Sequence, residues 1–125
     1  MAGMVLFVDD TKLMRKMAEV ALASAGYETL VAGDGQEALS LLQQYHDKIG
    51  LVLTDWHMPL LDGFGLLKSI KGSDKLKHIP VIMVTSDSEK GQARKAMDAG
   101  AAGYLVKPFS NYDEVIEAVR QHSRA

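Results

Sequence analysis

Residues 51–59 read Leu-Val-Leu-Thr-Asp-Trp-His-Met-Pro, an apolar run that ends on one carboxylate and soon meets a proline. A short apolar run without alternation is typical of a central strand in a parallel sheet, because helices cover both of its faces. Pro59 has no backbone N–H to give to a sheet, so the strand must end before it. Ligands of open parallel sheets bind beyond the carboxyl ends of the strands. We therefore expect Asp55 to lie at the binding edge of a sheet.

The remaining chain alternates between short apolar runs and segments with helical periodicity. The residue pattern predicts five strands, at 4–8, 28–32, 51–55, 81–85 and 103–107. A helix is expected after each of them, at 12–25, 34–45, 62–72, 86–100 and from 110 onward. In two of these helices Asp34 and Asp62 are interpreted as cap and turn residues. Alternating strands and helices predict a three-layer, doubly wound α/β fold with a five-stranded parallel sheet and five helices.

Length and composition place narrow limits on the class of protein. The 125 residues are expected to form one domain, 1–125, with 47% hydrophobic and 24% charged residues, as in ordinary globular proteins. The net charge of −2 gives no general attraction to nucleic acid or anionic lipid. No apolar stretch approaches the ~20 residues that a membrane helix needs, so membrane insertion is not expected. Cysteine is absent, which fits a cytoplasmic location.

Five polar side chains follow or end the predicted strands. They are Asp9, Asp10, Asp55, Thr85 and Lys107. Because parallel strands have their carboxyl ends at one edge, these groups are expected to converge. Carboxylates gathered together repel one another unless a cation compensates, and the set favours an oxygen-ligated divalent metal, most simply Mg²⁺. Mg²⁺ commonly bridges to a phosphate, which indicates phosphoryl chemistry.

The same residues carry a family resemblance along the whole chain. The motifs are Asp9-Asp10, Thr54-Asp55, Met58-Pro59, Asp62-Gly63, Thr85-Ser86 and Lys107-Pro108-Phe109. Their order and their positions at the strand ends resemble the receiver domain of two-component response regulators. This resemblance implies a flavodoxin-like fold with strand order 2-1-3-4-5. It also implies a phosphoacceptor switch, and not an enzyme that acts on a separate substrate.

The resemblance assigns roles to individual residues. Asp55 is the implied phosphoacceptor, with a histidine kinase or a phosphotransfer protein as donor. The implied Mg²⁺ ligands are Asp9, Asp10, Asp55 and the backbone carbonyl of His57. Thr85 and Lys107 match the hydroxyl and ammonium that contact the phosphoryl oxygens, and Tyr104 matches the switch aromatic. The positions that flank the phosphoryl group are His57 and Asp87, which we expect to set the lifetime of the phosphorylated state.

An output surface is expected on the helix after Thr85, the fifth strand and the last helix. Lys90, Arg94 and Lys95 are predicted to form a basic strip next to Tyr104 that suits an acidic partner segment, although a solvated helix face explains the charges equally well. Single-domain receivers of this kind resemble chemotaxis regulators. The chain is expected to be a monomer or a weak dimer.

Three other interpretations compete with the phosphoacceptor switch. A receiver-like docking module that never carries phosphate is the main rival. The segment 33–38 fits the Gly-x-Gly-x-x-Ala dinucleotide fingerprint, with Asp55 near the spacing of a ribose-binding acid, but it follows the second strand and leaves the other acids unexplained. A zinc site is disfavoured because the four histidines, His46, His57, His78 and His122, show no ligand spacing.

Overall fold

A computed structural model describes residues 3–85, 90–107 and 112–123. Five strands alternate with five helices in these ranges. In chain order they are β1 Met4–Val8, α1 Lys12–Ser24, β2 Thr29–Ala32, α2 Gly35–Tyr45, β3 Ile49–Asp55, α3 Gly63–Lys71, β4 Val81–Thr85, α4 Lys90–Asp98, β5 Gly103–Val106 and α5 Asp113–His122. The predicted number, type and order of the elements are confirmed.

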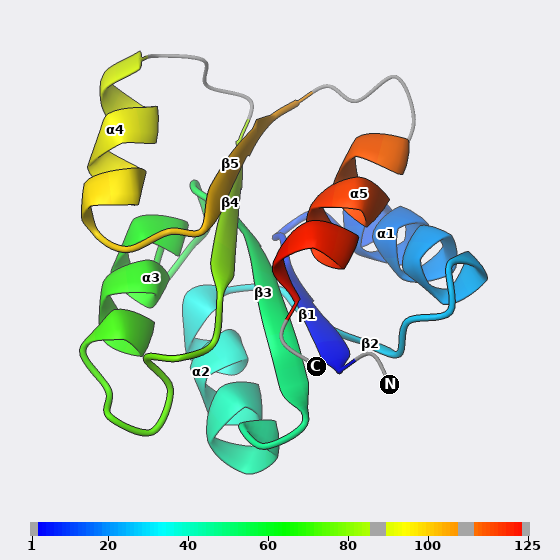
Figure 1. Cartoon of the computed structure of the whole chain (residues 1–125), viewed down its shortest axis with the longest axis horizontal. Coiled ribbons are helices and arrows are strands. Elements are labelled where there is room, and N and C mark those ends of the chain that lie inside the picture. Colours follow the sequence, from blue (N-terminus) through cyan, green and yellow to red (C-terminus); the bar gives the residue numbers. More distant parts are fainter. Residues whose placement is uncertain (1–2, 86–89, 108–111, 124–125) are drawn as a thin grey trace.

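All five strands are parallel, in the order β2-β1-β3-β4-β5. The flavodoxin-like order implied by the family resemblance is therefore confirmed. β3 is the central strand, and its register places Thr54 beside Val8 of β1 and Asp55 beside Val84 of β4. Figure 1 shows α2, α3 and α4 on one side of the sheet and α1 and α5 on the other.

Two apolar cores fill the spaces between the sheet and its helices. One joins β1, β3 and β4 to α2, α3 and α4, and includes Leu6, Val52, Leu67 and Ala96. The other joins the opposite sheet face to α1 and α5. Residues 49–54 of β3 are all buried, as expected for a strand covered on both faces.

The ends of several elements differ from the predicted ends. β3 begins at Ile49, two residues earlier than expected, because Gly50 continues the strand beside Gly3, where their backbones approach closely. β5 ends at Val106, so Lys107 is the first residue after the strand. α1 ends at Ser24 and β2 begins at Thr29, each one residue short of the predicted bound. The predicted starts of the fourth and fifth helices, at residues 86 and 110, lie outside the described residues.

α1 carries apolar residues on its outward face as well as on its inward face. Leu13, Met17 and Val20 are 65%, 45% and 55% exposed, whereas Ala18 and Leu22 are buried. Hydrophobic spacing alone therefore does not identify the buried face of α1. Methionines occur both in the core and on the surface, since Met83 is buried but Met17 and Met97 are exposed.

The N-termini of α2 and α3 are capped as predicted. The Asp34 carboxylate accepts from the Glu37 N–H at 2.8 Å, and the Asp62 carboxylate accepts from the Gly65 N–H at 2.8 Å. The Glu37 carboxylate reaches back to the N–H of Gly33, so the first turn of α2 is closed in both directions. In the described ranges, none of the helices has the length and apolar character to cross a membrane.

Candidate functional site

The strand ends bring most of the predicted site residues to one edge of the sheet. Asp9 and Asp10 follow β1 directly, Asp55 is the last residue of β3, and Lys107 follows β5. Thr85 ends β4 and pairs with Val106 of β5, so its backbone is also at this edge. Asp87 lies outside the described residues.

Three carboxylates form a compact cluster there. One carboxylate oxygen each from Asp9, Asp10 and Asp55 lies within 4.8 Å of the others. Asp9 is buried, Asp55 is half-buried and Asp10 is exposed, so the cluster opens to solvent on the Asp10 side. A compact set of hard oxygen donors with an open side suits Mg²⁺, which binds through one or two carboxylates and keeps several waters. The donor set therefore fits the predicted metal.

Lys107 links two of these carboxylates. Its ammonium lies 2.8 Å from Asp9 Oδ2 and 3.1 Å from Asp55 Oδ2. Burial alone lowers the pKa of Lys107, but hydrogen bonds and charge attraction from the two carboxylates outweigh it and raise that pKa. The lysine is thus held protonated, with its charge directed at the cluster.

The surroundings of Asp55 raise the pKa of its carboxylate. Burial raises its pKa, the charge and hydrogen bond of Lys107 oppose the rise, and the nearby Asp9 carboxylate adds to it. A hydrogen bond from the His57 backbone N–H also stabilises the ionised form. The pKa of Asp55 therefore stays above the usual value for an aspartate despite the contact with Lys107.

Backbone and side-chain donors fix Asp9 independently of Lys107. The Thr11 N–H donates to Asp9 Oδ1 at 2.8 Å, and the Arg15 guanidinium donates to the Asp9 carbonyl at 2.8 Å. Arg15 comes from the second turn of α1, so the helix that follows the acids also holds them in place. Sequence reasoning missed Arg15 because a basic residue on a helix gives no signal of its inward contact.

Glycines allow the loop after β3 to pack tightly against its surroundings. The Gly63 N–H donates to the Trp56 carbonyl at 2.8 Å, and a Cβ at Gly63 would lie 2.0 Å from the Asp55 carbonyl oxygen. The Gly35 N–H donates to the Leu61 carbonyl at 3.1 Å, and a Cβ there would lie 2.4 Å from that oxygen. The second glycine of the dinucleotide-like segment therefore packs on the loop that carries His57.

Tyr104 and the described residues of the predicted basic strip, Arg94 and Lys95, differ in burial and in contacts. Tyr104 is half-buried and packs against the core between the sheet and α2, α3 and α4. Arg94 is exposed, with its Nε 3.9 Å from Asp98 Oδ2. Lys95, however, turns toward α3, where its ammonium lies 4.7 Å from the Phe64 ring centroid. Lys95 is exposed as predicted, but its ammonium is directed toward α3, because one residue along a helix rotates a side chain by about 100°.

Comparison with known proteins assigns the chain to a family. The model of the response regulator receiver domain matches residues 5–120. The chain belongs to the response regulator receiver family. Among receiver proteins, chemotaxis protein CheY-3 of Vibrio cholerae is 40% identical over 107 residues, 85% of this chain and 81% of its own. Chemotaxis protein CheY of Pseudomonas aeruginosa is 38% identical over 107 residues, 85% of each chain.

Solved receiver structures have the same architecture. CheY4 of Vibrio cholerae superposes with a TM-score of 0.89 at 31% identity, covering 98% of this chain and 99% of that one. The CheX-CheY-BeF3-Mg+2 complex from Borrelia burgdorferi gives a TM-score of 0.87 at 29% identity, covering 94% and 86%. The receiver fold of this chain is therefore shown by sequence and by structure.

Two features of this receiver were not predicted. Trp56, next to Asp55, stacks on Phe64 with 5.2 Å between ring centroids and 10° between planes. Leu60 has a φ of 68° although it is not glycine, and its side chain is 76% exposed. The stacking of Trp56 on Phe64 could not be predicted, because two aromatic residues eight positions apart, across a loop and the start of a helix, form no recognisable pattern. The conformation of Leu60 could not be predicted either, because a left-handed backbone is rarely adopted by leucine.

Proposed function

We propose that this chain is a phosphoryl-accepting switch of two-component signalling. The phosphoryl group would pass to Asp55 from the phosphohistidine of a histidine kinase or a phosphotransfer protein. The observation that carries the proposal is the convergence of three carboxylates and the Lys107 ammonium at one edge of the sheet. Membership of the receiver family supports it.

The proposed reaction needs one bond made and one broken. An oxygen of the Asp55 carboxylate forms a P–O bond while the P–N bond to the donor imidazole breaks, and the bonding electron pair leaves with the imidazole. Lys107, 3.1 Å from Asp55 Oδ2, is placed to offset the charge of the incoming phosphoryl oxygens. His57 would contribute its backbone carbonyl, with Asp9, Asp10 and Asp55, to hold Mg²⁺. When bound, Mg²⁺ supplies positive charge that reduces repulsion between nucleophile and donor.

The proposed output lies beside α4 and β5. The Thr85 hydroxyl would follow the new phosphoryl oxygens, and the Tyr104 ring would fill the space that it leaves. A downstream protein would then recognise the surface of Lys90, Arg94 and Tyr104. The chain would act in the cytoplasm as a single domain of residues 1–125, a monomer or weak dimer.

The comparison structures support the partners and the metal of this proposal. One similar structure is named as a complex of CheY with CheX, BeF3 and Mg²⁺, and the similar curated proteins are named chemotaxis proteins. We therefore propose a Mg²⁺-dependent, chemotaxis-regulator-like switch with a protein target. The rival function, docking without phosphate, predicts the same fold and differs only in the chemistry of Asp55.

Labelling by a small acyl phosphate tests the proposal. Wild-type protein should take up one phosphoryl group with Mg²⁺ and none after chelation, and Asp55→Asn should take up none. Asp34→Asn is the matched control, because asparagine also caps a helix and Asp34 lies away from the cluster. Labelling of Asp55→Asn at the wild-type rate would show that another residue accepts the phosphoryl group. No labelling of the wild type would favour the docking module.

A further inference from the structure

Phe64 is contacted by groups from three parts of the chain. Trp56, the first residue after β3, stacks on its ring, at 5.2 Å between centroids. The Lys68 ammonium, one turn further along α3, lies 5.2 Å from the ring centroid, and the Lys95 ammonium of α4 lies 4.7 Å from it. Two like charges from neighbouring helices therefore meet at one aromatic ring.

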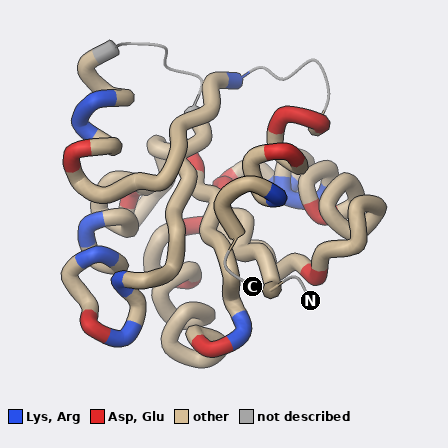
Figure 2. The backbone as a smooth tube through the Cα atoms, viewed as in Figure 1, with Lys and Arg blue, Asp and Glu red and all other residues tan. Residues whose placement is uncertain are grey.

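Among the described residues, no acidic side chain neutralises these two charges. Over residues 3–85, 90–107 and 112–123, neither Lys68 nor Lys95 makes an ion pair. A ring face attracts each ammonium, but it carries no net charge and does not remove their mutual repulsion. A carboxylate placed between the two would be attracted by both. In Figure 2, lysine and arginine positions mark both α3 and α4 on this side of the molecule.

The chemistry of the site favours a peptide over a polyanion. A net charge of −2 gives no general attraction to nucleic acid or anionic membranes, and two lysines are few for binding a polyanion at physiological salt. The half-buried Phe64 ring adds an apolar contact that a free inorganic anion does not use. Glutamate or aspartate beside an apolar side chain matches both halves of the site.

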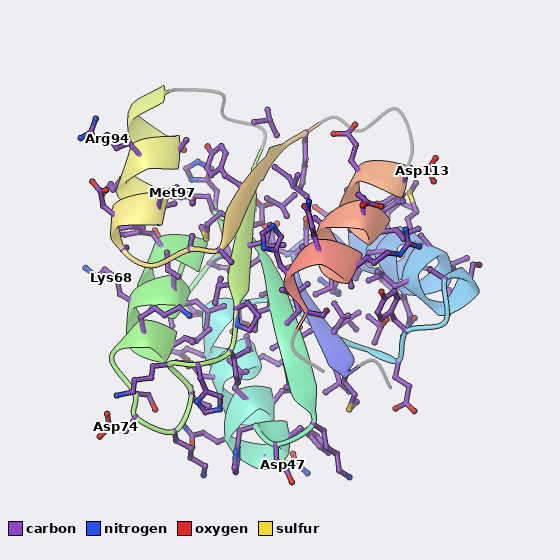
Figure 3. The ribbon with its side chains drawn as sticks, viewed as in Figure 1. Asp47, Lys68, Asp74, Arg94, Met97 and Asp113 are labelled. Atoms are coloured by element: carbon purple, nitrogen blue, oxygen red, sulfur yellow. The ribbon has the colours of Figure 1, made fainter. Side chains whose placement is uncertain are left out.

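We propose that Phe64, Lys68 and Lys95 form a docking surface for an acidic peptide segment of a partner protein. This surface lies between α3 and α4. It is distinct from the Lys90, Arg94 and Tyr104 surface, because Lys95 turns away from Arg94 toward α3. Figure 3 shows Lys68 projecting outward from α3 and Arg94 from α4. The inference does not require phosphate on Asp55, so it stands or falls separately from the proposed function.

Trp56 provides a direct readout of this surface. It is the only tryptophan of the chain, and its indole stacks on the ring that the peptide would contact. A blocked peptide of glutamate and leucine, free of aromatic residues, should change Trp56 emission in a saturable way at low ionic strength. Isothermal titration of the same peptide checks the affinity without the fluorophore.

Paired variants identify the residues responsible. Lys68→Gln with Lys95→Gln should weaken peptide binding about fivefold, as expected for the loss of two exposed charge pairs. The matched control is Lys12→Gln with Lys16→Gln, which removes two exposed lysines from α1 on the other side of the sheet and should leave the affinity unchanged. Equal weakening in both double variants, or no saturable binding to the wild type, would overturn the proposal. Displacement of the peptide by equimolar tripolyphosphate would also overturn it, in favour of a small-anion site.

Discussion

Lys107 reaches from the end of β5 to Asp9 after β1 and Asp55 of β3, and so connects three strand ends through one ammonium. The sequence predicts this meeting, because the carboxyl ends of parallel strands share an edge. It does not predict the fixed geometry of Asp9, which depends on the Thr11 N–H and on Arg15 from the following helix. Long-range contacts of single side chains leave no periodic signal in a sequence.

The side chains of His57 and Asp87 are predicted to set the lifetime of the phosphorylated state. The His57 side chain is exposed beside Asp55, where an imidazole can obstruct an attacking water. A carboxylate at residue 87 can instead orient that water. His57→Ala and Asp87→Ala should each change the dephosphorylation rate, in opposite directions, measured by loss of label after removal of the donor. Rates that both stay within about twofold of wild type, ~0.4 kcal/mol in barrier, would contradict the prediction.

Leu60 is predicted to lower stability. A left-handed conformation costs a residue with a Cβ about 1–2 kcal/mol, and this exposed side chain gains little burial in return. Leu60→Gly should therefore raise the free energy of unfolding by about 1 kcal/mol in urea denaturation. The control is Leu13→Gly, at a leucine of α1 that is also largely exposed, which should lower the free energy of unfolding by about 1 kcal/mol. A loss of stability in both variants would show that the Leu60 backbone is not strained.

Substitution of glycine by alanine is predicted to have opposite effects on stability at Gly63 of α3 and at Gly91 of α4. A Cβ at Gly63 would lie 2.0 Å from the Asp55 carbonyl oxygen, whereas none of the described residues has an atom within 4 Å of a Cβ at Gly91. Gly63→Ala should therefore destabilise the protein by about 2 kcal/mol or more through overpacking. Gly91→Ala should stabilise it by up to about 1 kcal/mol through helix propensity. Urea denaturation followed by Trp56 emission measures both, and equal changes would contradict the assigned contacts.

The type and order of the elements follow from apolar periodicity. All five predicted strands are confirmed, and the pattern is clearest in the central strands because they are strongly buried. The ends of the elements are less predictable, because they depend on local contacts. Gly50 looks like a turn residue but continues β3 beside Gly3, and α1 carries a second apolar face at Leu13, Met17 and Val20. Capping residues such as Asp34 and Asp62 are predictable because the contact is made within one turn.

At the scale of the molecule, the sheet connects the acidic site to the surface beside α4. β4 carries Thr85 at its end, and β5 carries Tyr104, whose ring packs into the core that also holds Ala96 of α4. In the proposed switch, a change at the strand ends would reach α4 through this packed core. A partner that favours the rearranged surface must by linkage also favour the phosphorylated state.

The most direct test of this account is the change in backbone amide chemical shifts when beryllofluoride is added with Mg²⁺. The account predicts shifts near Asp9, Asp10 and Asp55 together with shifts at Tyr104 and residues 88–99. It also predicts no change when Mg²⁺ is chelated or when Asp55→Asn is used. Shifts confined to the three acids, with Tyr104 and residues 88–99 unmoved, would contradict the claim that chemistry at Asp55 alters the surface beside α4.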